Sequence, residues 1–233
     1  MWSDKEIRES VMKPQFIYLV RHGESEGNVN EEIYKTVPDY RVGLTAKGRK
    51  QAVQAGKNIE KNALSRVIFS DEYQPKVTIY SSPWTRARET TQGIIKGLGK
   101  KFVIVRSYED PRLREQGWGN YKEDHLQRKI NRERKAFGTF FYRMPHGESG
   151  ADVYDRITTF IDTLYRDFDK HYSDINIIVT HGLTLKAFLT RFFHWSHEQF
   201  DGYKNPQNCE VFRMVLGQND KYVLETPMRM RKA

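Results

Sequence analysis

The sequence predicts an α/β protein with a mainly parallel sheet and helices on both of its faces. Short runs rich in β-branched and aromatic residues alternate along the chain with longer segments of helical periodicity. Two of these runs, residues 16–20 and 175–180, are almost continuously apolar, which is typical of central strands that are buried on both faces. No internal repeat, low-complexity tract or linker interrupts residues 1–233, so we expect a single domain.

Composition predicts a soluble globular protein with a modest core. Apolar residues make up 38% of the chain and charged residues 30%, and no apolar run approaches the length of a membrane-spanning helix. The N-terminal residues mix acids and bases without an apolar stretch, so a secretory signal is not expected. The single cysteine, Cys209, excludes an internal disulfide. Together these features predict a cytoplasmic protein.

The chain is strongly basic, with a net charge of +9 and a pI of about 9.5. A basic excess favours anionic partners. No zinc-finger, RNA-recognition or basic-zipper pattern is present, so a nucleic-acid partner is not expected, whereas a phosphorylated small molecule fits the charge. Residues 121–143 form a basic helical region with seven basic and three acidic side chains. This region is either a cap that faces the substrate or a solvated helix.

The first predicted strand ends in residues that can carry chemistry. Residues 16–20 are followed by Arg21, His22 and Gly23, and ligands of open α/β sheets bind just beyond the carboxyl ends of the strands. Gly23 would let the backbone turn and approach a ligand closely. His22 is therefore a candidate nucleophile and Arg21 a candidate phosphate ligand. The alternative is a strand-end histidine that serves as a turn or core residue.

A polar segment, residues 24–42, follows this strand and is expected to be a flexible loop that lines the site. Its Asn28 could donate its side-chain amide to a phosphate oxygen, or it could be an ordinary loop residue. The next helix opens with Thr45 as its N-cap, and small and apolar residues recur along it at helical spacing. Its predicted buried residues are Ala52, Ala55, Ile59 and Ala63.

A second strand, residues 77–80, leads into the next helix. Ser82 as the N-cap and Pro83 as the first helical residue predict where that helix begins. Two arginines, Arg86 and Arg88, fall in its first turns, where the helix dipole disfavours a cation unless an anion lies nearby. Arg86 is the stronger candidate for phosphate binding, and a surface role is plausible for Arg88.

A third strand, residues 102–105, leads to a loop rich in glycine and aromatic residues. This loop holds Glu115 near Trp118, which makes the Glu115 carboxyl group a candidate general acid. A solvated loop acid is the commoner alternative. The basic helical region follows the loop. Its thin apolar stripe consists of Leu126, Ile130 and Phe137.

The second strongly buried strand, residues 175–180, also ends in a histidine. His181 and Gly182 separate this strand from a helix that is predicted to begin at Leu183, and a helix N-terminus is a natural anion site. Before the strand, residues 149–152 form a capping-box pattern at the start of the most regular amphipathic helix. The predicted buried residues of that helix are Val153, Ile157, Phe160, Ile161, Leu164 and Phe168.

The remaining segments complete the predicted domain. Residues 211–216 and 222–224 are expected to be late edge strands. Residues 1–13 are an N-terminal extension, and residues 121–146 are a basic, cap-like insertion. Residues 226–233 are a basic tail, which is expected to be mobile towards its end.

Two strand-end histidines, two arginines and a loop acid form a set that is suited to phosphoryl transfer through a phosphohistidine. His22 must be neutral to attack phosphorus, and neighbouring cations lower the pKa of a histidine. Arg21, Arg86 and His181 would hold the equatorial oxygens as charge develops. Glu115 would protonate the leaving oxygen and then deprotonate the water that clears the intermediate.

Patterns for metal binding are weak in this sequence. His194 and His197 are three residues apart, but no neighbouring set of carboxylates or cysteines completes a site around them. Their expected role is packing or surface exposure. We therefore predict neither a metal ion nor a cofactor.

Five blocks that follow one another along the chain carry a family resemblance. They are Leu19-Val20-Arg21-His22-Gly23-Glu24-Ser25, Leu44-Thr45 with Gly48 and Gln51-Ala52, Ser82 with Arg86-Ala87 and Thr90, Leu113 with Glu115 and Gly119, and Val179-Thr180-His181-Gly182. These blocks span most of the chain, and together they are highly specific. They resemble the histidine phosphatase (phosphoglycerate mutase-like) superfamily.

The resemblance implies a three-layer α/β/α sandwich around a mainly parallel mixed sheet, and no metal. In that superfamily the residue matching His22 carries the phosphoryl group, and the residue matching Glu115 is the proton donor. Gly182, which adjoins the second histidine, is a further predicted substrate contact. The residues that match the phosphate ligands of the superfamily are Arg21, Asn28, Arg86 and His181.

Further segments, residues 34–39, 114–120, 140–149 and 195–200, resemble the plant and fungal branch of phosphoglycerate-mutase-like proteins. That branch includes a broad-range acid phosphatase. True mutases carry a tryptophan at the position of Gly27 and a longer insertion before the Gly-Glu-Ser block. Fructose-2,6-bisphosphatases normally accompany a kinase domain, and no Gly-Lys-Ser/Thr phosphate loop is present here.

The sequence therefore predicts a metal-independent phosphatase of the histidine acid phosphatase type. It would hydrolyse phosphomonoesters of small molecules, with a broad substrate range, through a phosphohistidine at His22. A cofactor-dependent phosphoglycerate mutase is the second hypothesis. The third is a non-catalytic module that binds a polyanion or a protein through the basic region.

Overall fold

Six strands form one mixed sheet in the order β3-β2-β4-β1-β5-β6. The computed structural model describes residues 13–65, 73–119 and 124–231. The first four strands run parallel to one another, and the last two run antiparallel to their neighbours. The strands are β1 (Phe16–Arg21), β2 (Lys76–Ser81), β3 (Val103–Glu109), β4 (Ile175–Thr180), β5 (Val211–Leu216) and β6 (Tyr222–Leu224).

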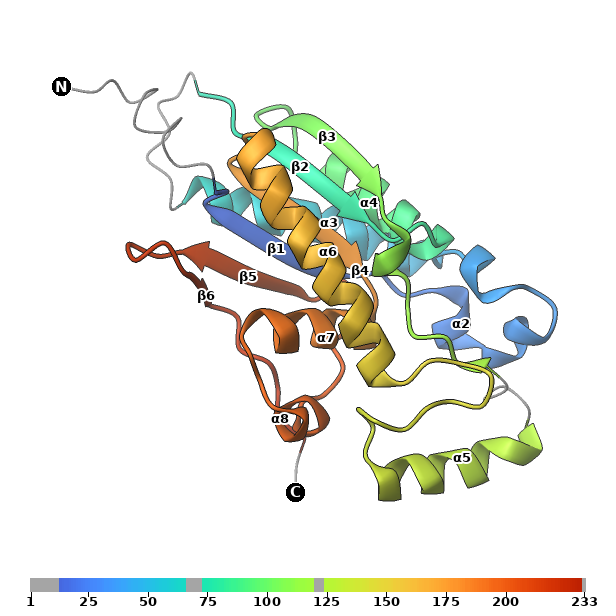
Figure 1. Ribbon diagram of the computed structural model, residues 1–233. Helices are drawn as coiled ribbons and strands as arrows, with labels where there is room; N and C mark the ends of the chain where they lie inside the picture. The colour runs from blue at the N-terminus through green and yellow to red at the C-terminus, as the bar shows by residue number, and fades with distance from the viewer. Residues whose placement is uncertain (1–12, 66–72, 120–123, 232–233) are drawn as a thin grey trace.

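Helices cover both faces of the sheet, as predicted. In Figure 1, α6 (Gly150–Lys170) lies in front of the sheet, and α3 (Ala46–Leu64) and α4 (Thr85–Gly97) lie behind it. The side chains of α7 (Gly182–Phe192) pack into the same apolar cluster as those of α6. The three-layer α/β/α architecture is therefore confirmed.

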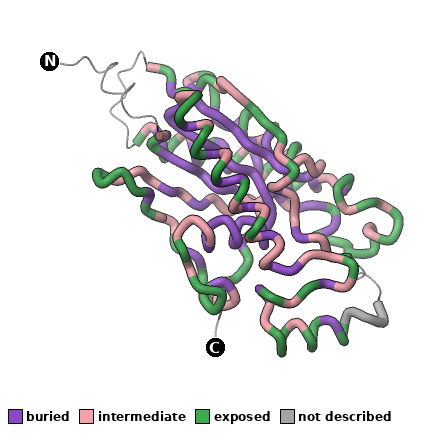
Figure 2. Tube along the Cα trace, in the orientation of Figure 1, coloured by how far each residue is buried: buried purple, intermediate pink, exposed green. Residues whose placement is uncertain are grey.

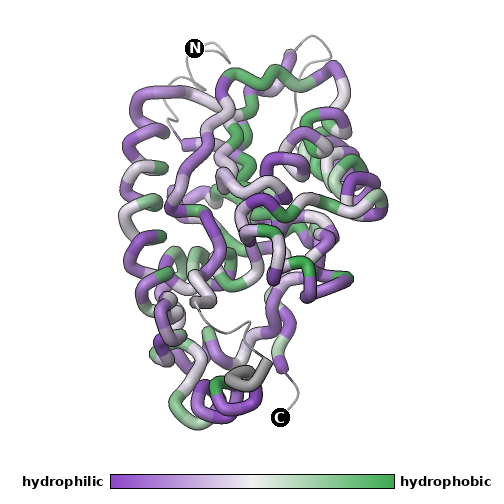
Figure 3. Tube along the Cα trace, turned by 90° about the vertical axis from the view of Figure 1, so that its right-hand side faces the viewer, coloured by the Kyte–Doolittle hydropathy of each residue, from purple (hydrophilic) through white to green (hydrophobic). Residues whose placement is uncertain are grey.

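The central strands supply side chains to both layers. Along β1, Phe16, Tyr18 and Val20 pack towards α3 and α4, whereas Ile17 and Leu19 pack towards α6 and α7. Both sets are almost fully buried, which explains why this strand is continuously apolar rather than alternating. Figure 2 shows the buried strands in purple at the centre of the molecule, and Figure 3 shows hydrophilic and hydrophobic stretches alternating along the covering helices.

The predicted starts of two long helices are confirmed. Thr45 caps α3 by accepting a hydrogen bond of 3.0 Å from the backbone N–H of Gly48. Ser149 and Asp152 form the predicted capping box of α6. All of the predicted buried residues of these two helices are buried.

The start of α4 was predicted two residues too early. Trp84, not Ser82, is its N-cap, and the helix begins at Thr85. The Ser82 hydroxyl instead lies 2.8 Å from a ring nitrogen of His181, so a side chain assigned to helix capping belongs to the site. Similarly, α7 begins at Gly182 with His181 as its N-cap, one residue earlier than predicted.

The segment predicted as a flexible loop, residues 24–42, is largely helical. It contains the short helix α2 (Glu26–Val29) and the 3-10 turns η1 (Glu31–Lys35) and η2 (Asp39–Arg41). Local side-chain caps stabilise these turns, for example Asn30, whose Oδ1 accepts a hydrogen bond from the Glu32 backbone N–H.

Two strand predictions also need correction. The third strand, β3, spans Val103–Glu109 instead of residues 102–105, because its pairing with β2 continues to the Ser81–Glu109 pair. β5 is not an edge strand, because it pairs with β1 on one side and with β6 on the other. Only β6 forms that edge of the sheet.

The basic region contains α5 (Asp124–Phe137), followed by turns up to Arg143. Of the predicted stripe, Ile130 is buried but Phe137 is 69% exposed, so the apolar face of this helix is narrower than expected. Residues 120–123, at the start of the region, lie outside the described residues, as does most of the N-terminal extension.

Residues 228–231 of the basic tail pack against the domain and are hydrogen-bonded to it. The Met228 side chain is buried, and backbone hydrogen bonds join the tail to the end of α8 (His197–Gly202). One of these bonds runs from the Lys204 N–H to the Arg229 carbonyl and another from the Arg231 N–H to the Gly202 carbonyl. This part of the expected mobility is therefore wrong, and the last two residues lie outside the described ranges. None of the helices in those ranges is long and apolar enough to cross a membrane.

Candidate active site

Strand register brings the two histidines together. β1 and β4 are parallel neighbours, and Arg21 pairs with Thr180 at their ends. The next residues, His22 and His181, therefore project beyond the same edge of the sheet, with their ring centroids 5.1 Å apart in an edge-on arrangement. Strand β2, which pairs with the other side of β4, ends beside the two histidines and places Ser82 against His181.

The hydrogen bonds of His22 define which ring nitrogen can attack. Nδ1 lies 2.7 Å from the Gly23 carbonyl oxygen, which can only accept, so Nδ1 carries the proton. Nε2 then keeps its lone pair, and it accepts a hydrogen bond of 3.3 Å from Nε of Arg86. Burial, followed by the charges of Arg86 and Arg21, holds the His22 pKa well below its usual value. His22 is thus a neutral imidazole with a nucleophilic Nε2.

Arg86 is fixed by three surrounding groups. Its Nη1 donates to the carbonyl and to the carboxylate of Asp39, at 2.8 and 2.9 Å. Its guanidinium carbon lies 4.6 Å from the centre of the Trp84 ring, in a cation–π contact. Arg86 is only 4% exposed. This cation is therefore held rigidly beside His22.

Two buried nitrogens at this end of the pocket lack a partner among the described residues. Arg21 donates through Nη1 to the Pro206 carbonyl at 2.6 Å, but its Nε has no acceptor. His181 is bonded to Ser82 through Nε2, and its Nδ1 has no partner. A buried polar atom without a partner is costly. An anion held against these groups would supply the acceptor for Arg21 Nε, and also for His181 Nδ1 when that nitrogen carries the ring proton.

His181 shares the electrostatic environment of His22. Burial is the main cause of its lowered pKa, and the charge of Arg86 and the proximity of His22 act in the same direction. The Trp84 ring packs edge-on against the His181 ring at a centroid distance of 5.0 Å. His181 is fully buried. It lies next to His22 but is not one of the residues that line the open pocket.

Glu115 is held at the N-terminus of α7. Its Oε1 accepts hydrogen bonds from the N–H and the hydroxyl of Thr184, at 3.2 and 3.1 Å, and its Oε2 accepts one from the N–H of Leu183 at 3.3 Å. The helix that begins immediately after His181 therefore positions the candidate acid as well. This contact explains how a residue from a distant loop reaches the histidines.

Glu148 anchors the loop that carries Glu115. Its carboxylate accepts hydrogen bonds from Arg114 at 2.5 Å, from Nε of Arg156 at 3.0 Å and from the N–H of Gly117 at 2.8 Å. Arg156 also donates to the Glu115 carbonyl at 3.2 Å. In addition, the Glu148 N–H donates to the Gly117 carbonyl at 2.8 Å. These bonds fix the loop on both sides of Glu115.

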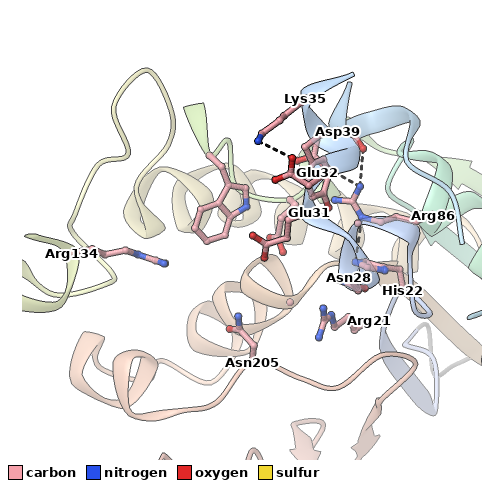
Figure 4. A pocket seen from close by; sticks show the side chains of 15 residues that line it. Arg21, His22, Asn28, Glu31, Glu32, Lys35, Asp39, Arg86, Arg134 and Asn205 are labelled. Carbon is pink, nitrogen blue, oxygen red and sulfur yellow. Dashed lines mark hydrogen bonds and ion pairs between the residues drawn. The ribbon is translucent and has the colours of Figure 1, made fainter. Parts of the chain in front are cut away.

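One pocket of about 470 Å³ opens over these groups, a volume in the usual range for small-molecule sites. Figure 4 shows Arg21, His22 and Arg86 on one side of the pocket and Arg134 on the other. The lining residues are Arg21, His22, Gly27, Asn28, Glu31, Glu32, Tyr34, Lys35, Asp39, Arg86, Glu115, Trp118, Arg134, Gly182 and Asn205.

Most of the predicted site residues thus lie around this one pocket. Asn28 is among them, but its Oδ1 already accepts hydrogen bonds from the Ser25 N–H and from Asn208. Arg88 lies outside the site and pairs with Glu109 at 2.8 Å, in keeping with a surface role. Gly23 is required for a reason other than ligand approach, because a Cβ there would lie 2.6 Å from the carbonyl oxygen of Gly48.

Several residues of the site were not identified from the sequence. Asp39 was included only in a turn and in a segment of the resemblance, Glu148 only in such a segment, and Ser82 only in a block of the resemblance and as a helix cap. Trp84 carried no signal of its own. Pairing of a buried arginine with an acid from a distant segment depends on tertiary structure and has no local pattern.

No group of three or more histidine, cysteine, aspartate or glutamate side chains is arranged to hold a metal ion in the part of the chain that the structure describes. The two histidines considered for this role are apart from the site. His197 pairs with Glu198 at 2.9 Å on the surface.

The two buried histidines should make the protein less stable in mild acid. Both are neutral when folded, but the unfolded chain binds protons at the ordinary pKa of about 6.5. Since the unfolded state then holds more protons, the free energy of unfolding should fall as pH drops from about 6.5 to 5, by up to about 1.4 kcal/mol per pH unit for each histidine. Urea unfolding across this range measures the slope.

His181→Asn should reduce this slope, whereas the exposed control His197→Asn should keep it. Equal unfolding free energies at pH 6.5 and pH 5 for the unaltered protein would contradict the assignment of neutral, buried rings.

A family model, curated relatives and solved structures match this chain. The model of the histidine phosphatase superfamily (branch 1) matches residues 17–226. Phosphoglycerate mutase-like protein AT74 of Arabidopsis thaliana is 42% identical over 226 residues, which cover 93% of this chain and 69% of the relative. Broad-range acid phosphatase DET1 of Saccharomyces cerevisiae is 30% identical over 298 residues, covering 92% and 89%. Bacillus stearothermophilus YhfR has the same fold, with a TM-score of 0.65, 23% identity and coverage of 90% and 95%.

Proposed function

The chain belongs to the histidine phosphatase superfamily (branch 1), and on that premise we propose that it is a metal-independent phosphomonoesterase acting through a phosphohistidine at His22. The observation that carries the proposal is the state of His22. Its Nδ1 is protonated against a carbonyl, its Nε2 keeps a lone pair towards Arg86, and two arginines are fixed beside it.

In the first step, Nε2 of His22 forms a bond to phosphorus while the ester P–O bond breaks. Glu115 gives its proton to the departing oxygen, so that an alcohol leaves instead of an alkoxide. Arg21, Arg86 and His181 hold the other phosphoryl oxygens. Arg21 Nε and His181 Nδ1, the two unpartnered buried nitrogens, support this role because each gains a partner when the phosphoryl group is bound.

In the second step, Glu115 accepts a proton from water, and the resulting hydroxide attacks phosphorus. The bond between phosphorus and Nε2 breaks, which releases inorganic phosphate and restores the neutral imidazole of His22 and the protonated Glu115. The charge that develops is balanced by fixed side-chain cations, which is the usual strategy for phosphoryl transfer.

The shape of the pocket at Gly27 favours hydrolysis over mutase activity. A Cβ at this position would lie 2.2 Å from the Tyr34 hydroxyl oxygen, so the Tyr34 ring fills the space next to the glycine. True mutases place a tryptophan here, and such a side chain would have to displace Tyr34. The name of the relative DET1, a broad-range acid phosphatase, supports a broad range of small phosphorylated substrates.

The proposal is tested by removing metal ions. The protein should release phosphate from an aryl phosphate in EDTA at a rate within about twofold of the rate in magnesium, because side-chain cations hold the phosphoryl oxygens. Acid quenching would destroy the intermediate, so an alkaline quench with a radiolabelled ester should capture the phosphoryl group on His22. Activity that returns only when a divalent ion is added back would refute the proposed mechanism.

A further inference from the structure

One wall of the pocket carries two solvent-exposed carboxylates. Glu31 lines the pocket and has no ion-pair or hydrogen-bond partner for its carboxylate among the described residues. Its neighbour Glu32 also lines the pocket and lies 2.8 Å from the ammonium group of Lys35. Figure 4 shows Glu31 and Glu32 between Arg134 and Arg86 in that view. A substrate that reaches His22 therefore places its leaving group near Glu31.

The lining is electrically balanced although the whole chain has a net charge of +9. Among the cations, Arg86 is paired with Asp39, Lys35 with Glu32, and Arg134 lies over the Trp118 ring with its guanidinium carbon 5.0 Å from the ring centre. Arg21 and Arg86 are needed by the phosphoryl group, which itself brings nearly two negative charges. A second anionic group that lies on the Glu31 side of the pocket would meet a carboxylate.

The same wall suits hydroxyl groups. The Glu31 carboxylate accepts hydrogen bonds, and the side-chain amide of Asn205 on another side of the pocket both donates and accepts them. Trp118 adds a flat apolar surface that packs against the carbon face of a sugar or polyol.

We propose that this pocket selects phosphomonoesters with an uncharged, hydroxyl-bearing leaving group and discriminates, through Glu31, against esters that carry a second anionic group. The proposal rests on the proposed phosphatase function and names its substrate class. It places phosphoglycerates and bisphosphates among the poor substrates and polyol or sugar monophosphates among the good ones.

Racemic glycerol 3-phosphate and racemic 3-phosphoglycerate provide a matched test, because they differ only in a hydroxymethyl group in place of a carboxylate. At about 0.1 M ionic strength, kcat/KM for phosphate release should be about tenfold or more higher for glycerol 3-phosphate. Glu31→Gln should narrow the ratio to about threefold by raising kcat/KM for 3-phosphoglycerate. Glu26→Gln, which removes an exposed charge from the same segment outside this pocket, should leave the ratio as it was.

Titration calorimetry of both esters with His22→Ala separates this proposal from the phosphatase assignment. If neither ester releases phosphate from the unaltered protein, the proposed phosphatase function is wrong. The ratio of the two dissociation constants then still shows whether the pocket discriminates against a second negative charge. Equal values for the two esters, a preference for 3-phosphoglycerate, or a ratio that Glu31→Gln does not change would overturn the role of Glu31.

Discussion

His22→Ala should abolish phosphate release from aryl and alkyl phosphates alike. In the proposed mechanism the variant loses the nucleophilic nitrogen that accepts the phosphoryl group, so both substrate classes lose the same step. We expect kcat/KM to fall by about a thousandfold or more. Stopped assays with an aryl phosphate and with glycerol phosphate, at equal enzyme concentration, measure the loss.

The substitution must be separated from damage to the fold, because His22 is buried. A phosphate or vanadate titration of His22→Ala should still show binding, since Arg21, Arg86 and His181 remain. His197→Ala, at an exposed histidine paired with Glu198, is the matched control and should keep full activity. If His22→Ala retains more than a few per cent of the activity while it is folded, the nucleophile must be another residue.

Glu115→Gln should slow alkyl phosphates far more than aryl phosphates. An aryl group leaves as a stabilised phenolate and needs little help, whereas an alkoxide needs a proton as the P–O bond breaks. General acid catalysis typically contributes roughly 10²–10⁴-fold, so kcat for glycerol phosphate should fall within that range and kcat for an activated aryl phosphate by much less. The ratio of the two rates is the measurement, and the acidic limb of the pH profile should change with it.

Neighbouring acids of the same loop are already engaged elsewhere, which makes them suitable controls. Glu109 pairs with Arg88 at 2.8 Å, and Asp110 pairs with Arg112 at 2.6 Å. Asp110→Asn should therefore leave the ratio of alkyl to aryl rates unchanged. An equal loss of both rates in Glu115→Gln would mean that Glu115 positions the site without donating a proton.

The pocket residues at the strand ends were predictable from local sequence. His22 and His181 follow the two most strongly apolar strands, and strands of that kind occupy the centre of a parallel sheet. Their carboxyl ends meet at one edge, so both histidines were expected there, and the contact between their rings follows because β1 and β4 are neighbours. Arg86 was identifiable because a cation in the first turn of a helix needs a compensating anion.

The walls of the pocket could not be predicted in the same way. The polar composition of residues 24–42 indicated a loop, yet short helical turns aim Glu31 and Asp39 at the site. These turns depend on contacts with distant residues, such as the bond from Arg86 to the Asp39 carbonyl. Ser82 was misassigned for a related reason, because its best partner is a histidine on another strand.

The anchoring of Glu148 has an evolutionary consequence. Its backbone and side chain both bond to Gly117, so the two ends of the stretch from 118 to 147 are held together, while Phe140 within it packs into the core of the domain. The entropic cost of such a closed loop grows only slowly with its length. Changes in length outside the packed Phe140 region should therefore leave Glu115 in place. Because it brings Trp118 and Arg134 to the pocket, we expect that its replacement would change which esters the proposed phosphatase accepts.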